Sequence, residues 1–165
     1  MSNGRTILLL SGPNLQLLGE RHPEIYGTTT LGDLVELSRR RAGEHGFELE
    51  HVQSDAEAEL VSAVHSARGR VEAIVVNAGA LTHYGWALSD ALACFDGVVV
   101  ELHVSNPDAR EPWRRTSVIA PVADGCVSGF GALGYDLAVD AAARLVASRV
   151  PVPPSPPAAG AEPAV

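Results

Sequence analysis

The feature that most constrains the fold is a series of short apolar runs separated by segments with helical periodicity. Each run is rich in Val, Ile and Leu, and the runs cover Ile7–Ser11, Phe47–Val52, Val71–Asn77, Gly97–Leu102 and, more weakly, Gly125–Val127. A run such as Ala73–Asn77 is apolar at consecutive positions, which indicates a strand buried on both faces. Strands that alternate with single helices form βαβ units, so the sequence predicts a parallel sheet.

The segments between these runs predict helices at Leu31–Glu44, Glu57–Ala67, Tyr84–Ala93 and Gly131–Ser148. Five strands with helices on both faces predict an α/β fold of the flavodoxin-like type, with the parallel strand order 2-1-3-4-5. Residues 1–149 are therefore expected to form a single domain. The candidate site residues described below predict that this domain is catalytic. Residues 150–165, rich in Pro and Ala, are predicted to be a disordered tail.

The charge balance limits the classes of partner. The net charge of −8 argues against nucleic acid and against an anionic membrane surface. All 12 cationic side chains are Arg and none is Lys, which excludes catalysis through a lysine Schiff base. No apolar stretch is long enough to span a bilayer and no signal peptide is evident, so a cytoplasmic protein is expected.

The two cysteines, Cys94 and Cys126, lie in apolar sequence and lack the spacing of metal ligands. We expect both to be buried structural thiols in a reducing compartment.

The segment from Ser11 to Gly27 follows the first predicted strand and is rich in Gly and Pro. It is too long for an ordinary strand-to-helix connection, and a long loop in a compact α/β domain is usually a binding loop or lid. The segment carries Arg21 and Tyr26. An arginine about 4 Å from a phenol contributes roughly 4 kcal/mol at an effective dielectric constant of about 20. That energy lowers a phenol pKa from about 10 toward neutrality, although an exposed Arg and a packed Tyr would look the same in sequence.

Polar residues gather where the predicted parallel strands end. In such folds ligands bind at the carboxyl ends of the strands, so one crevice is expected to hold these residues. The set comprises Asn14, Arg21, Tyr26, Asn77, His83, Glu101, His103, Ser105 and Arg114. Asn77 could instead form a turn, and His83 could cap a helix.

Glu101 and His103 are two positions apart at a strand end, so their side chains share one face. A carboxylate beside an imidazole accepts its N–H, fixes its tautomer and leaves the other nitrogen to exchange a proton. The alternative is a polar pair that only caps the strand. No third metal ligand has a fitting spacing, so no metal is expected.

Arg110, Arg114 and Arg115 form a basic cluster after the fourth strand. The guanidinium fork suits a carboxylate, so the cluster predicts a small anionic ligand, although it could also be a solvated helix face. The sequence lacks a phosphate-binding Gly-rich loop and a nucleophile elbow. What remains is acid–base chemistry without a cofactor: removal of a proton beside a carbonyl and acid-assisted loss of a leaving group.

Several motifs together resemble the type II 3-dehydroquinate dehydratases over residues 5–147. The motifs are Gly12–Gly19 with Arg21, Pro23–Gly27, Gln53-Ser54, Asn77–His83, Glu101–Asn106 and Ala109-Arg110. The resemblance implies a dodecamer of four trimers and no cofactor. It also implies dehydration of 3-dehydroquinate to 3-dehydroshikimate by anti elimination through an enolate, as in the shikimate pathway.

The resemblance also implies a role for each matching residue. Tyr26 would remove the C2 proton with its pKa lowered by Arg21, and Asn14 would hold the water that stabilises the enolate. His103, oriented by Glu101, would protonate the departing C1 hydroxyl. The substrate-binding residues would be Asn77, His83, Val104, Ser105 and Arg114, with Asp90 reaching into a neighbouring subunit's site.

Some positions depart from the family pattern: His22, Tyr84-Gly85-Trp86, Asp108, Trp113 and Thr116. None is assigned to the chemistry, but together they could reshape the pocket rim. They leave open a catabolic role in quinate breakdown and a dehydratase of a related cyclic hydroxy acid. The alternative to an enzyme is a binding module without catalysis, but such a module would not need an acid and a base.

Overall fold

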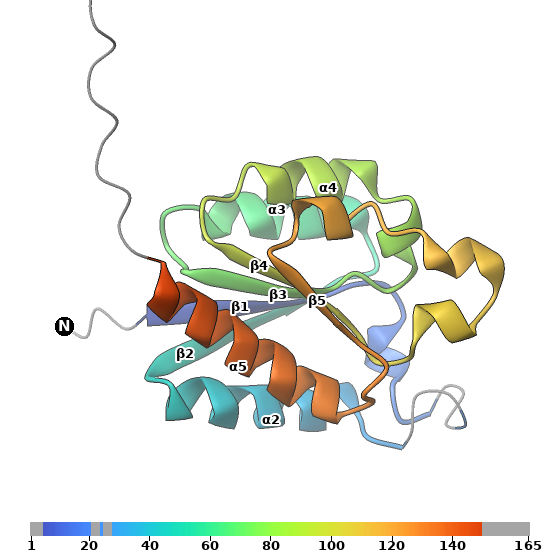
Figure 1. Ribbon diagram of the computed structural model, residues 1–165, viewed down its shortest axis with the longest axis horizontal. Helices are drawn as coiled ribbons and strands as arrows, with labels where there is room; N and C mark the ends of the chain where they lie inside the picture. Colours follow the sequence, from blue (N-terminus) through green and yellow to red (C-terminus); the bar gives the residue numbers. More distant parts are fainter. Residues whose placement is uncertain (1–4, 21–23, 25–27, 150–165) are drawn as a thin grey trace, which may run out of the picture.

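Five parallel strands form one sheet in a computed structural model, which describes residues 5–20, 24 and 28–149 (Figure 1). The strands are β1 (Arg5–Ser11), β2 (Phe47–Gln53), β3 (Ala73–Asn77), β4 (Val98–His103) and β5 (Gly125–Ser128). Their order across the sheet is β2-β1-β3-β4-β5, and every neighbouring pair is parallel. The predicted fold class and strand order are confirmed.

Two layers of helices cover the two faces of the sheet (Figure 1). One face packs against α2 (Leu31–Glu44) and α5 (Leu133–Ser148). The other face packs against α3 (Glu57–Ala67) and α4 (Trp86–Ala93).

The central strand β1 shows why its apolar residues are consecutive. Ile7 and Leu9 pack toward α2 and α5, whereas Leu8 and Leu10 pack toward α3 and α4. Successive side chains of a strand point to opposite faces, so a strand between two helical layers needs apolar residues at every position. All four side chains are at most 1% exposed.

The bounds of α2 and α3 agree with the prediction, but α4 begins two residues later than expected. A short 3-10 helix, η2 (Gly79–His83), comes first, and the Gly85 amide donates to the Leu81 carbonyl at 2.6 Å. A Cβ at Gly85 would lie 2.7 Å from that carbonyl oxygen, so only glycine fits the tight turn between the two helices. Similarly, α5 begins at Leu133 rather than Gly131.

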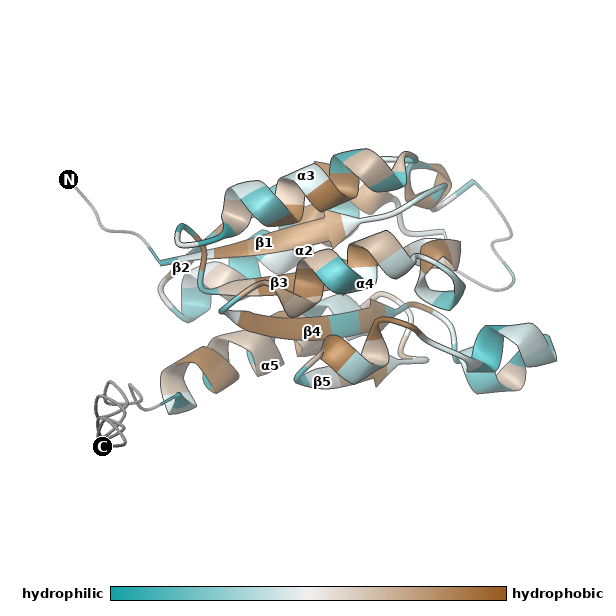
Figure 2. Cartoon of the chain, turned by 90° about the horizontal axis from the view of Figure 1, so that it is seen from above, coloured by the Kyte–Doolittle hydropathy of each residue, from teal (hydrophilic) through white to brown (hydrophobic). Residues whose placement is uncertain are grey.

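The sequence pattern predicts neither a helix nor a strand with defined bounds in the connection from β4 to β5. This connection contains three short 3-10 helices, η3 (Pro107–Ala109), η4 (Pro112–Arg115) and η5 (Ala120–Val122). Figure 2 shows the apolar strands in brown and the helical turns beyond the end of β4 mostly in teal. The 3-10 helices η3 and η4 lie beyond the carboxyl end of β4, whereas η5 packs against α4.

Two predicted segments lie outside the described residues: the tail at 150–165, and the loop positions Arg21 and Tyr26. None of the helices in the described part of the chain combines the length and the hydropathy that a transmembrane span needs.

Candidate active site

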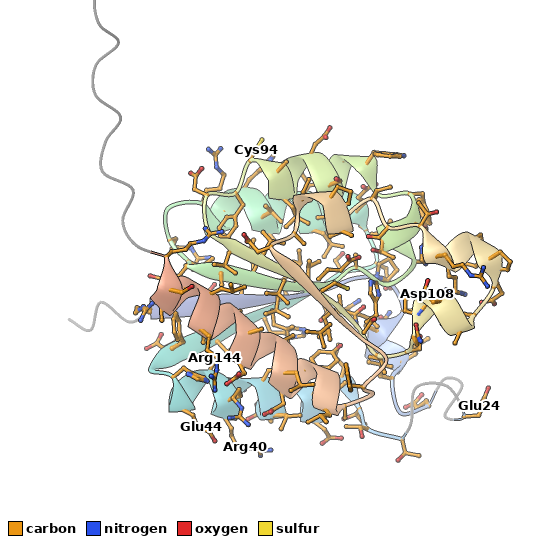
Figure 3. The ribbon with its side chains drawn as sticks, viewed as in Figure 1. Glu24, Arg40, Glu44, Cys94, Asp108 and Arg144 are labelled. Carbon is orange, nitrogen blue, oxygen red and sulfur yellow. The ribbon has the colours of Figure 1, made fainter. Side chains whose placement is uncertain are left out.

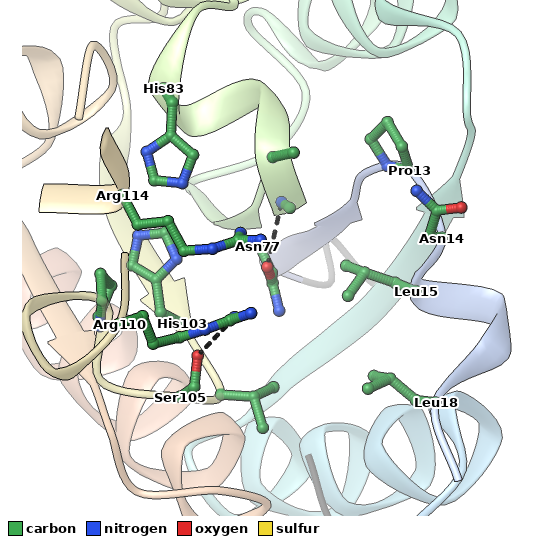
Figure 4. A pocket seen from close by; sticks show the side chains of 14 residues that line it. Pro13, Asn14, Leu15, Leu18, Asn77, His83, His103, Ser105, Arg110 and Arg114 are labelled. Atoms are coloured by element: carbon green, nitrogen blue, oxygen red, sulfur yellow. Dashed lines mark hydrogen bonds between the residues drawn. The ribbon is translucent and has the colours of Figure 1, made fainter. Parts of the chain in front are cut away.

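A pocket opens at the carboxyl ends of β1, β3 and β4 (Figure 4). Its walls come from the loop after β1, from η2, and from the segment that follows β4. The residues that line it are Pro13, Asn14, Leu15, Leu18, Asn77, Gly79, Ala80, His83, His103, Val104, Ser105, Pro107, Arg110 and Arg114.

Seven of the residues predicted from sequence lie in this one pocket: Asn14, Asn77, His83, His103, Val104, Ser105 and Arg114. Glu101 lies directly behind it, bonded to His103. Asp90 is exposed on α4 and does not line the pocket. Arg110, predicted only as part of a basic cluster, is a lining residue, and its side chain donates to the Ser105 hydroxyl at 3.4 Å.

The Glu101 carboxylate is fully buried and fixes His103. Its Oε1 atom accepts from the Ser117 hydroxyl at 2.7 Å, from the Thr82 hydroxyl, and from His103 Nε2 at 2.9 Å. Burial alone would raise the pKa of Glu101, but the hydrogen bonds from His103, Thr82 and Ser117 outweigh it and hold that pKa below its usual range. An ionised carboxylate only accepts hydrogen bonds, so His103 donates its Nε2–H, which leaves Nδ1 to exchange a proton with a ligand.

The second histidine, His83, is oriented by the backbone. Its Nδ1 lies 2.7 Å from the carbonyl oxygen of Thr116, which can only accept, so Nδ1 carries the proton. The ring also makes an edge contact with Trp113, with ring centroids 5.1 Å apart. Nε2 is then the ring nitrogen that can accept a hydrogen bond from a ligand hydroxyl.

Asn77 forms the floor of the pocket at the end of β3, and it is 3% exposed. Its amide Nδ2 donates to the Tyr135 hydroxyl of α5 at 3.1 Å, and its Oδ1 accepts from the Gly79 amide at 3.2 Å. Burial raises the pKa of Tyr135 to about 12, and the hydrogen bond from Asn77 offsets this only in part. Tyr135 therefore stays protonated and serves as a structural partner of Asn77 rather than as a base.

Two guanidinium groups give the pocket a positive wall. Arg114 donates from Nε to Glu111 at 2.7 Å and stacks on the Trp113 ring at 4.1 Å. These contacts hold its side chain near that of Arg110, beside His103 and Ser105 (Figure 4). Paired guanidinium groups suit a carboxylate ligand.

The opposite wall is the loop after β1, and it is shaped by two unusual positions. A Cβ at Gly12 would lie 2.3 Å from the Ala78 carbonyl oxygen, so the segments that follow β1 and β3 approach closely only because residue 12 is glycine. Asn14 has φ of 66°, the left-handed conformation that Asn tolerates.

Asp55, which the sequence analysis did not single out, anchors this loop. Its Oδ1 accepts from the Asn14 amide at 2.9 Å and its Oδ2 accepts from the Gln16 side chain at 2.7 Å. The hydrogen bond from the Asn14 backbone amide contributes most to lowering the pKa of Asp55, and the hydrogen bond from Gln16 contributes next. Asp55 thus holds Asn14 in place from the connection between β2 and α3.

The expectation that both cysteines are buried is wrong, because Cys94 and Cys126 are exposed. Cys94 follows the last turn of α4, and Cys126 lies on β5, an edge strand of the described sheet. Burial of its sulfur and the nearby Glu101 charge raise the pKa of Cys126 to about 11. Among the described residues, ligand atoms of Glu101, His103 and Cys126 form one group within 4.8 Å of one another that could hold a metal ion.

Comparison with known proteins identifies the family. The model of the family described as "Dehydroquinase class II" matches residues 5–143. The chain belongs to the class II dehydroquinase family. It is 52% identical over 134 residues to 3-dehydroquinate dehydratase 1 of Corynebacterium efficiens, covering 81% of this chain and 89% of that protein. It is 48% identical over 137 residues to the catabolic 3-dehydroquinase of Penicillium rubens, covering 83% of this chain and 88% of that protein.

Solved structures of class II dehydroquinases share the fold. The type II dehydroquinase of Propionibacterium acnes superposes with a TM-score of 0.81 at 39% identity, covering 86% of this chain and 97% of that one. The enzyme of Butyrivibrio crossotus gives a TM-score of 0.82 at 35% identity, covering 89% and 100%. The predicted family is confirmed, and with it membership of a family of hydro-lyases.

The folding stability of this class II dehydroquinase should depend on pH through the buried carboxylate of Glu101. Because folding lowers the pKa of Glu101, its charge stabilises the fold at higher pH, and that stability is lost as pH falls through the lowered pKa. At neutral pH we expect Glu101→Gln to lower the free energy of unfolding by about 2 kcal/mol. Urea unfolding at a series of pH values should show this difference shrinking as the pH falls through the lowered pKa of Glu101. Exposed Glu48→Gln serves as the control, and a difference independent of pH would contradict the assignment.

Because Asp55 anchors Asn14, replacing Asp55 should lower activity although no residue that lines the pocket is substituted. Asp55→Ala frees the Asn14 amide and should lower kcat/KM about tenfold to a hundredfold, because small displacements of a positioned group are costly. Steady-state kinetics measure the effect. Asp96→Ala removes an exposed aspartate that precedes β4, at the opposite edge of the sheet, and should leave kcat/KM unchanged. Equal values for the two variants would count against the anchor.

Proposed function

We propose that this chain dehydrates 3-dehydroquinate to 3-dehydroshikimate by anti elimination through an enolate, without a cofactor. The observation that carries the proposal is the buried Glu101–His103 pair, which faces a pocket with two arginines, in a chain that belongs to this family. The relatives from Corynebacterium efficiens and Penicillium rubens are named for the same reaction.

The substrate's carboxylate would bind to the positive wall of the pocket. Arg114 is held by Glu111 and Trp113, so its guanidinium loses little freedom on binding an anion. Arg110 adds a second cation next to Ser105. The ring hydroxyls would bind to Asn77, to the Nε2 atom of His83, and to the Ser105 hydroxyl and Val104 backbone.

His103 would act as the general acid. The Nε2–H of His103 donates to the buried Glu101 carboxylate, so the proton that passes to the C1 hydroxyl is carried on Nδ1. As the C1–O bond breaks, the proton moves from Nδ1 to the departing oxygen, and water leaves. Glu101 stays ionised throughout and holds the ring in orientation.

Tyr26 would act as the base, with Arg21 stabilising its phenolate. Both residues lie outside the described residues, so their roles rest on the motif that they share with the family. Asn14 lies on the wall opposite His103 (Figure 4). Anti elimination requires Tyr26 to remove the C2 proton from the face opposite the acid. Asn14 would hold the water that stabilises the enolate oxygen.

Dehydration of 3-dehydroquinate is the same reaction in biosynthesis and in quinate breakdown, so it does not distinguish the two pathways. Relatives named as catabolic and relatives named without a pathway are similarly close to this chain, at 48% and 49% identity for example. Tyr84 and Trp86 are more than half exposed and lie outside the pocket lining, whereas Trp113 contacts both His83 and Arg114.

The central test follows the conjugated enone of 3-dehydroshikimate by ultraviolet absorbance after 3-dehydroquinate is added. We expect turnover by the unmodified enzyme, and losses of about a hundredfold to ten-thousandfold in kcat for Tyr26→Phe and His103→Ala. Exposed Tyr84→Phe and His65→Ala are matched controls that should keep full activity. Folded enzyme that yields no enone would refute the function, and full turnover by both site variants would refute the roles.

Assembly is part of the proposal: twelve subunits as four trimers, with Asp90 completing the site of a neighbour. Its exposed position on α4, outside the pocket of its own chain, supports this placement. Light scattering and activity measured together during dilution should show activity falling as trimers dissociate. A fully active monomer would contradict the shared site.

A further inference from the structure

The Glu101 carboxylate has one oxygen that the mechanism does not use. All three donors, from Thr82, Ser117 and His103, bind to Oε1. Oε2 is buried and has no hydrogen-bond partner in the described part of the chain, although a buried charged oxygen normally has one. This atom is therefore available to a ligand, and a ligand for a carboxylate oxygen is either a proton donor or a cation.

Cys126 lies beside this oxygen because of the strand register. Glu101 and Cys126 are directly paired across β4 and β5, so their side chains share the sheet face that His103 also uses. A carboxylate oxygen, an imidazole nitrogen and the Cys126 sulfur lie within 4.8 Å of one another. Cys126 is an exposed residue of the edge strand and does not line the pocket, but its sulfur is partly buried beside Glu101.

We propose that Glu101, His103 and Cys126 form a site for a thiophilic divalent cation of the zinc class. Zinc accepts mixed oxygen, nitrogen and sulfur ligands, whereas calcium and magnesium do not favour sulfur. Tetrahedral bonds of about 2.0–2.3 Å place ligand atoms about 3.3–3.8 Å apart, so small side-chain rotations close the present spacing. The thiol proton passes to solvent when the thiolate binds, and the fourth position stays open to water.

Occupancy of this site stops the proposed reaction. A His103 nitrogen bound to the cation and a Glu101 carboxylate shared with it cannot serve as a proton donor and its orienting partner. The site thus makes the enzyme sensitive to zinc through a residue, Cys126, that takes no part in catalysis. This consequence rests on the proposed function, but binding of the cation does not.

Binding is tested on the intact, chelator-treated protein with Co²⁺, whose bonds to thiolate give an ultraviolet charge-transfer band. We expect the band in unmodified protein and in Cys94→Ala, since Cys94 lies on the outer side of α4, away from the pocket (Figure 3). Cys126→Ala should lose the band and bind Co²⁺ more than about tenfold more weakly. Absence of the band in unmodified protein, or its loss in Cys94→Ala only, would overturn the site.

Inhibition is tested separately with Zn²⁺ in the enone assay. Zinc should lower kcat in unmodified enzyme and in Cys94→Ala, and a chelator should restore it. Cys126→Ala should keep its basal activity and need about tenfold more zinc for the same inhibition. Equal inhibition of both variants would reject the link to Cys126. If the chain failed to turn over 3-dehydroquinate, the proposed function would fail while the Co²⁺ result still decided the cation site.

Discussion

The buried carboxylate of Glu101 is the contact on which most of the pocket depends. It binds His103 directly, and it also receives the hydroxyls of Thr82 and Ser117. Thr82 precedes His83 in η2, and Ser117 follows Thr116, whose carbonyl orients His83. One charge therefore ties the end of β4 to two segments that are distant in sequence and sets the orientation of both histidines. The hydrogen bonds offset its burial and keep it ionised.

The fold and much of the pocket could be predicted because they follow from local pattern. Consecutive apolar residues in β1 and β3 indicated strands covered on both faces, and helical periodicity gave the bounds of α2 and α3. Parallel strands bring their carboxyl ends to one edge, so polar residues after each strand had to meet there. Asn77 and His103 follow or end neighbouring strands, and both lie in the one pocket that this rule predicts.

Contacts between distant segments could not be predicted in the same way. Asp55 binds Asn14, and Tyr135 binds Asn77, across separations that no sequence pattern encodes. The expected burial of Cys126 followed from its apolar neighbours in sequence and is wrong, although the predicted strand order already places β5 at the edge of the sheet. The start of α4 shifted because Gly85 fits a tight turn that periodicity alone does not detect.

The hydrogen bond between Asn77 and Tyr135 determines when the pocket is completed during synthesis of the chain. Tyr135 belongs to α5, the last helix, whereas the residues that line the pocket all precede it in the chain. During synthesis on a ribosome, the floor of the pocket stays incomplete until α5 has left the exit tunnel and packed against β3 and β4. A nascent chain that ends before this helix would carry the pocket side chains but not the partner that holds Asn77 in place.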